Sequence, residues 1–281
     1  VYVVSHMANN VLKIDPKTRI EVGRVEVSER PWNVTLSADG SKLYVAHLLI
    51  GSGVSTLDAG SLAILHKVVL ADEPVPVPFD KKLPQGVSRG VYGAFPRPGT
   101  GEVWAPHMLL AVDTAQTDPV ASPQTNLDFE STVFPTISTV SADGAAEGRR
   151  LLLSPPSIAG APGSFSSIVA GPHAVAFTPD GSLALMLNSQ SEDVVVFDAE
   201  PGIQRQLVRP LPGAGMLQGI VINSTGTHAY VEGRATHNVT VLSIDPSKEF
   251  APVQVDGAPI ERLASDPMPA TLRLGQRLFN T

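Results

Sequence analysis

The stretch Gly171–Asp198, GPHAVAFTPDGSLALMLNSQSEDVVVFD, contains three short apolar runs separated by polar turn residues. The first run, Ala174–Phe177, is followed by Pro179-Asp180-Gly181, where glycine tolerates the positive φ of a tight hairpin. The second run is Leu183–Leu187, and the third, Val194–Phe197, closes on an aspartate. Apolar runs of this length joined by short polar turns predict three strands of one antiparallel meander.

The same pattern recurs along the chain, which marks it as a repeat protein. Pro31–Gly40 (PWNVTLSADG) and Leu217–Gly226 (LQGIVINSTG) align with Pro172–Gly181 position for position. Val1–Asp15 carries the second and third runs without a first, and a degenerate copy begins at Val91. Each repeat therefore supplies one small antiparallel sheet.

These repeats resemble the YVTN family of β-propeller repeats. The resemblance lies in the Pro-led first strand, the Asp-Gly or Thr-Gly hairpin, the Tyr-Val second strand and the third strand ending in Ile-Asp or Phe-Asp. It covers most of Val1–Asp256 and implies an all-β fold, a β-propeller of four-stranded antiparallel blades. The innermost strands are then expected at Pro31–Ser37, Val91–Pro96, Pro172–Thr178 and Leu217–Asn223.

Blade count and chain boundaries follow from this alignment. We expect four complete blades plus the partial one at Val1–Val27, in a seven-bladed parent. The alternative is a closed five-bladed ring, in which Gly257–Leu263 supplies the first strand missing from the partial blade. Val1 opens inside a blade and is no initiator Met, so we expect a segment of a longer, exported protein, periplasmic or at the cell surface. The predicted domains are 1–256, the propeller, and 257–281, a linker and the start of a further domain.

Composition excludes several classes of function. The 281 residues carry a net charge of −7 with a pI near 5.5, which argues against nucleic acid as a partner. No apolar run approaches the roughly 20 residues of a membrane helix, so we expect no membrane span. The absence of cysteine excludes disulfides, thiolate metal sites and covalent haem attachment within these residues.

Strand direction predicts which loops share a face. Loops between second and third strands lie on the same side as blade-to-blade links, opposite the Asp-Gly hairpins. Both long insertions, Asp72–Gly86 and Leu109–Glu130, fall on that side. Long loops commonly carry function, so this loop-rich side is the predicted binding face. Its predicted residues are His6, Arg30, Trp32, His47, His107, His173 and His237.

The imidazoles on this face allow two interpretations. Five of them around a channel mouth would suit a metal ion or acid–base chemistry near neutral pH. Alternatively, histidine is routine in polar loops, and separate blades hold these rings too far apart to share a ligand. We therefore expect no metal site in this chain. Arg149-Arg150 is interpreted as a solvated pair.

The tail differs from the repeats. Ser265-Asp266 before Pro267 is typical of a helix start, and Leu274 and Leu278 are four residues apart. Leu274–Phe279 (LGQRLF) resembles the Leu-Gly-x-x-Leu-Phe segment that opens the di-haem cytochrome c peroxidase family. That family's haem-binding Cys-x-x-Cys-His motifs come later, so no haem ligand can be assigned here. Without a partner domain, the tail is expected to be poorly ordered or packed on the propeller.

Three functions remain open from the sequence. The favoured one is the propeller domain of an exported multidomain redox protein, acting as a docking or substrate-presenting platform. Its partner would be a C-terminal cytochrome domain or a redox protein, with haem c in that C-terminal part and no cofactor in this chain. The second is a non-catalytic YVTN propeller that binds proteins or surface polymers. The third is a metal-dependent propeller enzyme.

Overall fold

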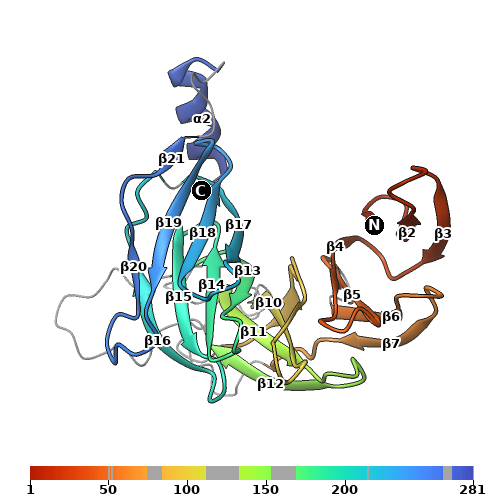
Figure 1. Cartoon of the computed structure of the whole chain (residues 1–281). Helices are drawn as coiled ribbons and strands as arrows, with labels where there is room; N and C mark the ends of the chain where they lie inside the picture. Colours follow the sequence, from red (N-terminus) through yellow and green to blue (C-terminus); the bar gives the residue numbers. More distant parts are fainter. Residues whose placement is uncertain are drawn as a thin grey trace, which may run out of the picture. The chain divides into compact units, whose positions relative to one another are not determined.

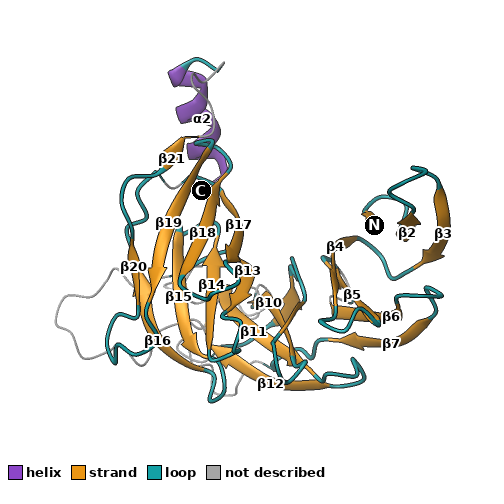
Figure 2. Cartoon of the chain, in the orientation of Figure 1, coloured by secondary structure: helices purple, strands orange, loops and turns teal. Residues whose placement is uncertain are grey.

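Antiparallel β-structure dominates the computed structural model of the chain, as Figure 2 shows. The structure describes residues 1–49, 51, 53–74, 84–111, 133–152, 169–213, 215–261 and 268–280. The chain divides into two compact units, Val1–Ser164 (unit 1) and Phe165–Thr281 (unit 2). Their sheets confirm the predicted all-β class with four-stranded antiparallel blades.

The first sheet of unit 1 has three strands, β1 (Tyr2–Ser5), β2 (Asn10–Ile14) and β3 (Glu21–Glu26), paired in that order. β1 pairs Tyr2 with Lys13 and Ser5 with Asn10, and no strand of the described residues pairs with its other side. This sheet is the partial blade that the sequence predicts.

The second sheet consists of β4 (Pro31–Leu36), β5 (Lys42–His47), β6 (Gly53–Asp58) and β7 (Ile64–Val69), paired in that order. Leu43 and Val45 of β5 belong to a core cluster shared with Val11 of the first sheet. Tyr44 and Ala46 point to the other face of β5 and belong to a second cluster with residues of the next sheet. Burial on both faces is what a sheet between two neighbours requires.

The third sheet contains β8 (Val87–Arg89), β9 (Phe95–Pro96), β10 (Val103–Leu110), β11 (Val133–Val140) and β12 (Glu147–Leu152). Its innermost strand is broken, because β8 and β9 both pair with β10. The predicted strand Val91–Pro96 is therefore wrong over most of its length. Gly90 has φ +73°, and a Cβ on Gly93 would lie 2.3 Å from the Phe95 ring, so the chain turns sharply between the two pieces.

Unit 2 contains the two sheets that the clearest repeats predict. The fourth sheet is β13 (Pro172–Phe177), β14 (Leu183–Asn188), β15 (Asp193–Asp198) and β16 (Ile203–Val208). The fifth is β17 (Leu217–Ile222), β18 (His228–Gly233), β19 (Asn238–Ile244) and β20 (Val253–Val255). The predicted innermost strands at β4, β13 and β17 are confirmed to within one residue.

The segment proposed to close a five-bladed ring is used differently. Ile260–Glu261 forms a short strand, β21, that pairs with Val239 and Asn238 of β19 in the last sheet. It does not pair with β1, whose partner is β2. Ile260–Glu261 therefore belongs to the last sheet, and the number of blades stays a prediction. This pairing also lies beyond the predicted domain boundary at residue 256, which itself stays a prediction.

The tail forms the helix α2 (Ala270–Asn280), which extends away from the strands of the last sheet in Figure 1. The predicted start at Ser265–Pro267 lies outside the described residues. The short C-terminal helix that the sequence predicts is thus confirmed. Leu272, Leu274 and Leu278 are 62%, 55% and 69% exposed, so these leucines do not show the packing on the propeller that was one of the two expected alternatives. In the part of the chain that is described, no helix has the length and apolar composition needed to cross a membrane.

Candidate binding face of unit 1

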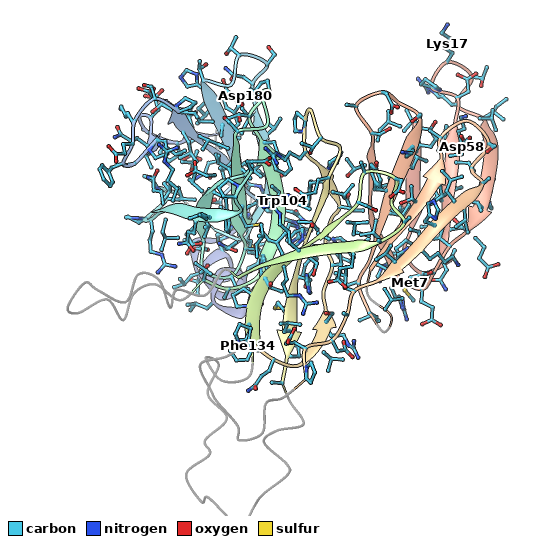
Figure 3. All side chains as sticks on the ribbon, turned by 90° about the horizontal axis from the view of Figure 1, so that it is seen from below. Met7, Lys17, Asp58, Trp104, Phe134 and Asp180 are labelled. Carbon is cyan, nitrogen blue, oxygen red and sulfur yellow. The ribbon has the colours of Figure 1, made fainter. Side chains whose placement is uncertain are left out.

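The two ends of the strands in unit 1 differ in their loops. We call loop face the side that carries the β1–β2 loop, the start of β4, the β5–β6 loop and the β7–β8 link. Figure 3 shows Met7 and Phe134 toward this side, whereas Lys17 and Asp58 lie at the opposite ends of the strands. Of the two insertions expected here, residues 75–83 and 112–130 lie outside the described part of the chain.

A row of three rings crosses the loop face. The Trp32 indole lies between His6 and Tyr92, with ring centroids 5.3 Å and 5.8 Å away. The interplanar angles are 88° and 83°, so both contacts are edge-to-face, an arrangement that aromatic quadrupoles favour. Trp32 lies in β4 and is 40% exposed, His6 lies in the β1–β2 loop, and Tyr92 lies between β8 and β9. The row therefore presents an aromatic surface to solvent.

Backbone contacts hold this row in place. His6 Nδ1 lies 3.2 Å from the carbonyl oxygen of Pro31, which fixes the imidazole beside the start of β4. Arg30 has φ +53°, and its amide donates to Asn9 Oδ1 at 2.9 Å. Its guanidinium contacts Met7 Sδ, which places a positive charge near the aromatic row. Burial raises the pKa of the Tyr92 phenol, so this ring keeps its proton at neutral pH.

A pocket of about 350 Å³ opens on the same face, at the crossover from β7 to β8. The Ser88 amide donates to Asp72 Oδ1 at 2.9 Å, and the Ser88 hydroxyl donates to the Ala71 carbonyl at 2.6 Å. Arg89 Nη1 donates to the Ser88 carbonyl at 2.7 Å. The lining thus combines a carboxylate and a guanidinium with apolar walls. Its described residues are Gly51, Val69, Leu70, Ala71, Asp72, Val87, Ser88 and Arg89.

A partly buried polar network joins the β7–β8 link, which lines the pocket, to the third sheet. Arg150 Nη2 donates to the Ala71 carbonyl at 2.6 Å and to Glu147 Oε1 at 3.0 Å, while Nη1 donates to Glu73 Oε2 at 3.1 Å. Glu147 in turn accepts from the Ala71 amide at 2.7 Å and from the Ser138 hydroxyl at 2.8 Å. The interpretation of Arg149-Arg150 as a solvated pair is therefore wrong, because Arg150 fastens the β7–β8 link to the third sheet.

Two of the predicted face histidines are inside the sheets. His47 is 2% exposed and His107 is fully buried. His47 Nε2 lies 2.8 Å from Ser55 Oγ, and His107 Nδ1 lies 3.1 Å from the Ala105 carbonyl. Burial lowers the pKa of each ring to about 4, so both are neutral at pH 7. Neither ring is accessible to a ligand at the surface, and we leave both out of the candidate site.

The remaining predicted histidines belong to unit 2. His173 in β13 is half-buried, and burial lowers its pKa. His237 has φ +54°, and its Nε2 accepts a hydrogen bond of 2.8 Å from Arg273 Nη2 of α2. His237 thus holds the tail helix. Of the predicted set, the structure brings His6, Arg30 and Trp32 together on the loop face.

Several residues of this face escaped the sequence analysis. Tyr92 lacked any local signal, because its contact with Trp32 depends on the packing of two sheets. Asp72 is the first residue of the Pro-rich connection. The length of that connection predicted a functional loop but did not single out Asp72. Ser88 and Arg89 lie in β8, a strand outside the predicted one. Among the described residues, no group of three His, Cys, Asp or Glu side chains is arranged to hold a metal ion.

No protein-family model matches the chain, and no curated protein matches it. Solved structures do resemble it. One is a functionally unknown protein from Desulfotomaculum acetoxidans DSM 771, with TM-score 0.58 and 13% identity, covering 91% of this chain and 65% of that one. Kuenenia stuttgartiensis hydrazine synthase has TM-score 0.53 and 15% identity, covering 86% and 79% respectively.

The Cps50 (Swd1) β-propeller domain of Myceliophteria thermophila is also similar, with TM-score 0.58 and 14% identity. The match covers 89% of this chain and 65% of that domain. The chain therefore spans less than two thirds of the length of two of these three structures. At such identities the similarity shows the fold alone, which is that of a β-propeller domain.

Proposed function

We propose that this chain is a binding propeller whose loop face docks a protein partner or presents a substrate. The observation that carries the proposal is the exposed Trp32 between His6 and Tyr92, on the same face as a pocket lined by Asp72 and Arg89. Tryptophan, tyrosine and arginine are the residue types that dominate binding energy at protein interfaces. Trp32 and Tyr92 in one row, with the Arg30 guanidinium and the pocket on the same face, support docking of a protein.

We further propose that the parent is an exported multidomain redox protein with YVTN-type repeats, periplasmic or at the cell surface. The repeats and the LGQRLF segment support this assignment. So does α2, whose Leu274 and Leu278 stand exposed. Exposed leucines on an amphipathic helix suit contact with a further domain. In this proposal haem c belongs to a C-terminal cytochrome domain, which this chain docks without itself holding the haem.

The redox part is tested on the parent gene. It should be expressed with its natural C-terminus under conditions that mature c-type cytochromes, and the purified protein examined for covalent haem by absorption spectroscopy and mass spectrometry. Covalent haem supports the redox assignment. A parent that matures without haem contradicts it and leaves the second function, a non-catalytic propeller that binds proteins or surface polymers.

The docking part is tested by adding the cytochrome domain as a separate protein. Trp32→Ala should weaken its binding to the 281-residue chain at least tenfold, measured by titration calorimetry. Leu36→Ala is the matched control, because Leu36 lies at the other end of β4 and is similarly exposed, at 45%. Equal loss in both variants, or no loss in either, would contradict docking through the loop face. Neither substitution changes the haem content of the parent protein. The redox assignment and docking through the loop face can therefore be contradicted independently of each other.

A further inference from the structure

Ser88 of β8 holds two side chains of opposite charge, one at each end of its backbone. The Ser88 amide donates to Asp72 Oδ1 at 2.9 Å, and the Ser88 carbonyl accepts from Arg89 Nη1 at 2.7 Å. The amide and carbonyl of a strand residue point to the same side, so both charges lie along the edge of β8 that does not pair with β10. A carboxylate and a guanidinium therefore line one pocket together.

Both charged groups keep bonding capacity for a ligand. Neither Asp72 nor Arg89 forms an ion pair with another described residue, whereas the nearby Arg150 is paired with Glu147 at 3.0 Å. One oxygen of the Asp72 carboxylate accepts from Ser88, which leaves the second oxygen for a ligand, and the Arg89 guanidinium has donors besides Nη1. Asp72 is exposed and Arg89 is half-buried, so a dissolved molecule can reach both.

The backbone on both sides of Asp72 is fixed. Before it, the Ala71 carbonyl accepts from the Ser88 hydroxyl at 2.6 Å. After it, the backbone groups of Glu73 and Gly86 exchange two hydrogen bonds of 2.8 Å. A binding group that is already in place loses less conformational entropy when a ligand arrives. The acidic group of the pocket is therefore preorganised.

The rest of the pocket suits a small molecule with an apolar part. Its volume of about 350 Å³ is near the lower end of the range for small-molecule sites, about 300–1,000 Å³. Val69, Leu70 and Val87 supply apolar walls. Apolar walls with a few placed polar groups are typical of such sites.

We propose that this pocket binds an α-amino acid with an apolar side chain. The ammonium group of the ligand donates to Asp72, its carboxylate accepts from Arg89, and its side chain contacts the apolar walls. A ligand with a single charge fits less well, because an anion meets the Asp72 carboxylate and a cation meets the Arg89 guanidinium. The inference rests on the proposed function in one respect, since it names the ligand that the loop face presents.

The test measures binding of L-leucine to the full 281-residue chain at pH 7 by titration calorimetry. Two probes share the carbon skeleton of leucine and carry one charge each: 3-methylbutylamine lacks the carboxylate, and 4-methylpentanoate lacks the ammonium group. Each should bind at least about tenfold more weakly than leucine, which corresponds to the loss of one charge-assisted hydrogen bond. Equal affinity for leucine and either probe would overturn the proposal. So would a failure of leucine, valine, methionine and phenylalanine all to bind at millimolar concentration.

Two variants test the charged groups. Asp72→Asn keeps an oxygen for the Ser88 amide and removes the charge, so leucine should bind at least about tenfold more weakly and 4-methylpentanoate more tightly. Arg89→Gln should likewise weaken the binding of leucine and strengthen that of 3-methylbutylamine. A gain of affinity cannot come from misfolding, so these opposite changes stay informative if a variant is less stable. Loss of leucine binding without either gain would overturn the assignment.

The control variant is Arg24→Gln, which removes an exposed arginine of β3 in the first sheet. It should bind leucine as the original chain does, and an equal loss of affinity there would contradict a role specific to Arg89. Docking through the loop face is measured separately, with Trp32→Ala and a protein ligand. Each of the two experiments can therefore fail while the other succeeds.

Discussion

His47 Nε2 lies 2.8 Å from Ser55 Oγ in the interior of the second sheet, where both side chains are almost completely buried. The same position at the end of β14 is occupied by Asn188, whose Nδ2 donates to Asp193 Oδ1 at 2.8 Å. The second strand of each of these two blades therefore ends in a buried polar side chain that bonds to the neighbouring third strand. In this setting histidine acts as a structural hydrogen-bonding group.

Burial of His47 makes the stability of unit 1 depend on pH. Its pKa is lowered from 6.5 to about 4 in the folded protein, so the unfolded chain binds a proton more readily. Stability is therefore complete above about pH 6.5 and is lost as pH falls toward 4, by up to about 3 kcal/mol for this ring. His107 contributes in the same direction.

Urea unfolding of the full chain at pH 7 and pH 5 measures this effect. His47→Asn, which copies Asn188, should reduce the loss of unfolding free energy between the two pH values, even if the variant is less stable at pH 7. An unchanged loss in His47→Asn would show that this imidazole does not carry the pH dependence.

The hairpin glycines Gly40 and Gly144 should differ sharply in tolerance to alanine. Both have positive φ, +72° and +78°. A Cβ on Gly40 meets nothing within 4 Å, so alanine there costs only the backbone strain, about 1 kcal/mol. A Cβ on Gly144 would lie 1.9 Å from Thr56 Oγ1, so alanine there should cost about 3 kcal/mol or more.

Thr56→Ala offers a check on the cause of that difference. The Thr56 hydroxyl is buried without a hydrogen-bond partner, so Thr56→Ala costs little and removes the closest contact, while the Thr56 Cβ stays 2.6 Å from the added Cβ. Gly144→Ala should accordingly be less destabilising in the Thr56→Ala background than alone, in chemical denaturation. Additive effects of the two substitutions would be incompatible with the collision.

Arg150→Met should destabilise unit 1 by about 2–4 kcal/mol, because it leaves a half-buried carboxylate at Glu147 with one cationic partner fewer. The control is Arg24→Met, whose pair with Glu21 is largely exposed and should contribute little to stability because water and salt screen it. Hydrogen exchange should also show the Ala71–Glu73 link opening in Arg150→Met. Similar losses of unfolding free energy in both variants would mean that the partial burial of the Arg150 network adds nothing to stability.

The tail leucines should be dispensable for the stability of this chain. Leu274→Ser and Leu278→Ser replace side chains that are 55% and 69% exposed, so the unfolding free energy should change by no more than about 0.5 kcal/mol. Thermal unfolding of the double variant provides the measurement. A loss above about 1 kcal/mol would show instead that α2 packs on the last sheet.

The sequence predicted the regular blades well, since their hairpins are encoded locally. Asp39-Gly40 and Asp180-Gly181 define the first turn of each repeat, and β4 and β13 begin at the predicted prolines. The third sheet was harder to predict. Its strand Val87–Arg89 is positioned by long-range contacts, among them the hydrogen bond from the Gly90 amide to the Leu48 carbonyl.

The residues of the loop face were predicted only in part, because some of them are also brought together by long-range contacts. His6 and Trp32 follow directly from strand direction, whereas the contact of Trp32 with Tyr92 requires the packing of adjacent sheets. His47 and His107 were assigned to loops because the apolar runs before them end early. The observed strands continue through both residues, since backbone pairing to β6 and β11 does not depend on apolar side chains.

The contrast between the chain's two tryptophans gives the loop face its own optical reporter. Trp104 is fully buried with its indole N–H bonded to Glu102 Oε2 at 3.0 Å, while Trp32 is 40% exposed. A dissolved quencher such as acrylamide reaches the indole of Trp32 and is shielded from that of Trp104. The quenchable, red-shifted part of the emission therefore comes from the aromatic row, and a molecule that settles there changes the fluorescence of the unlabelled protein.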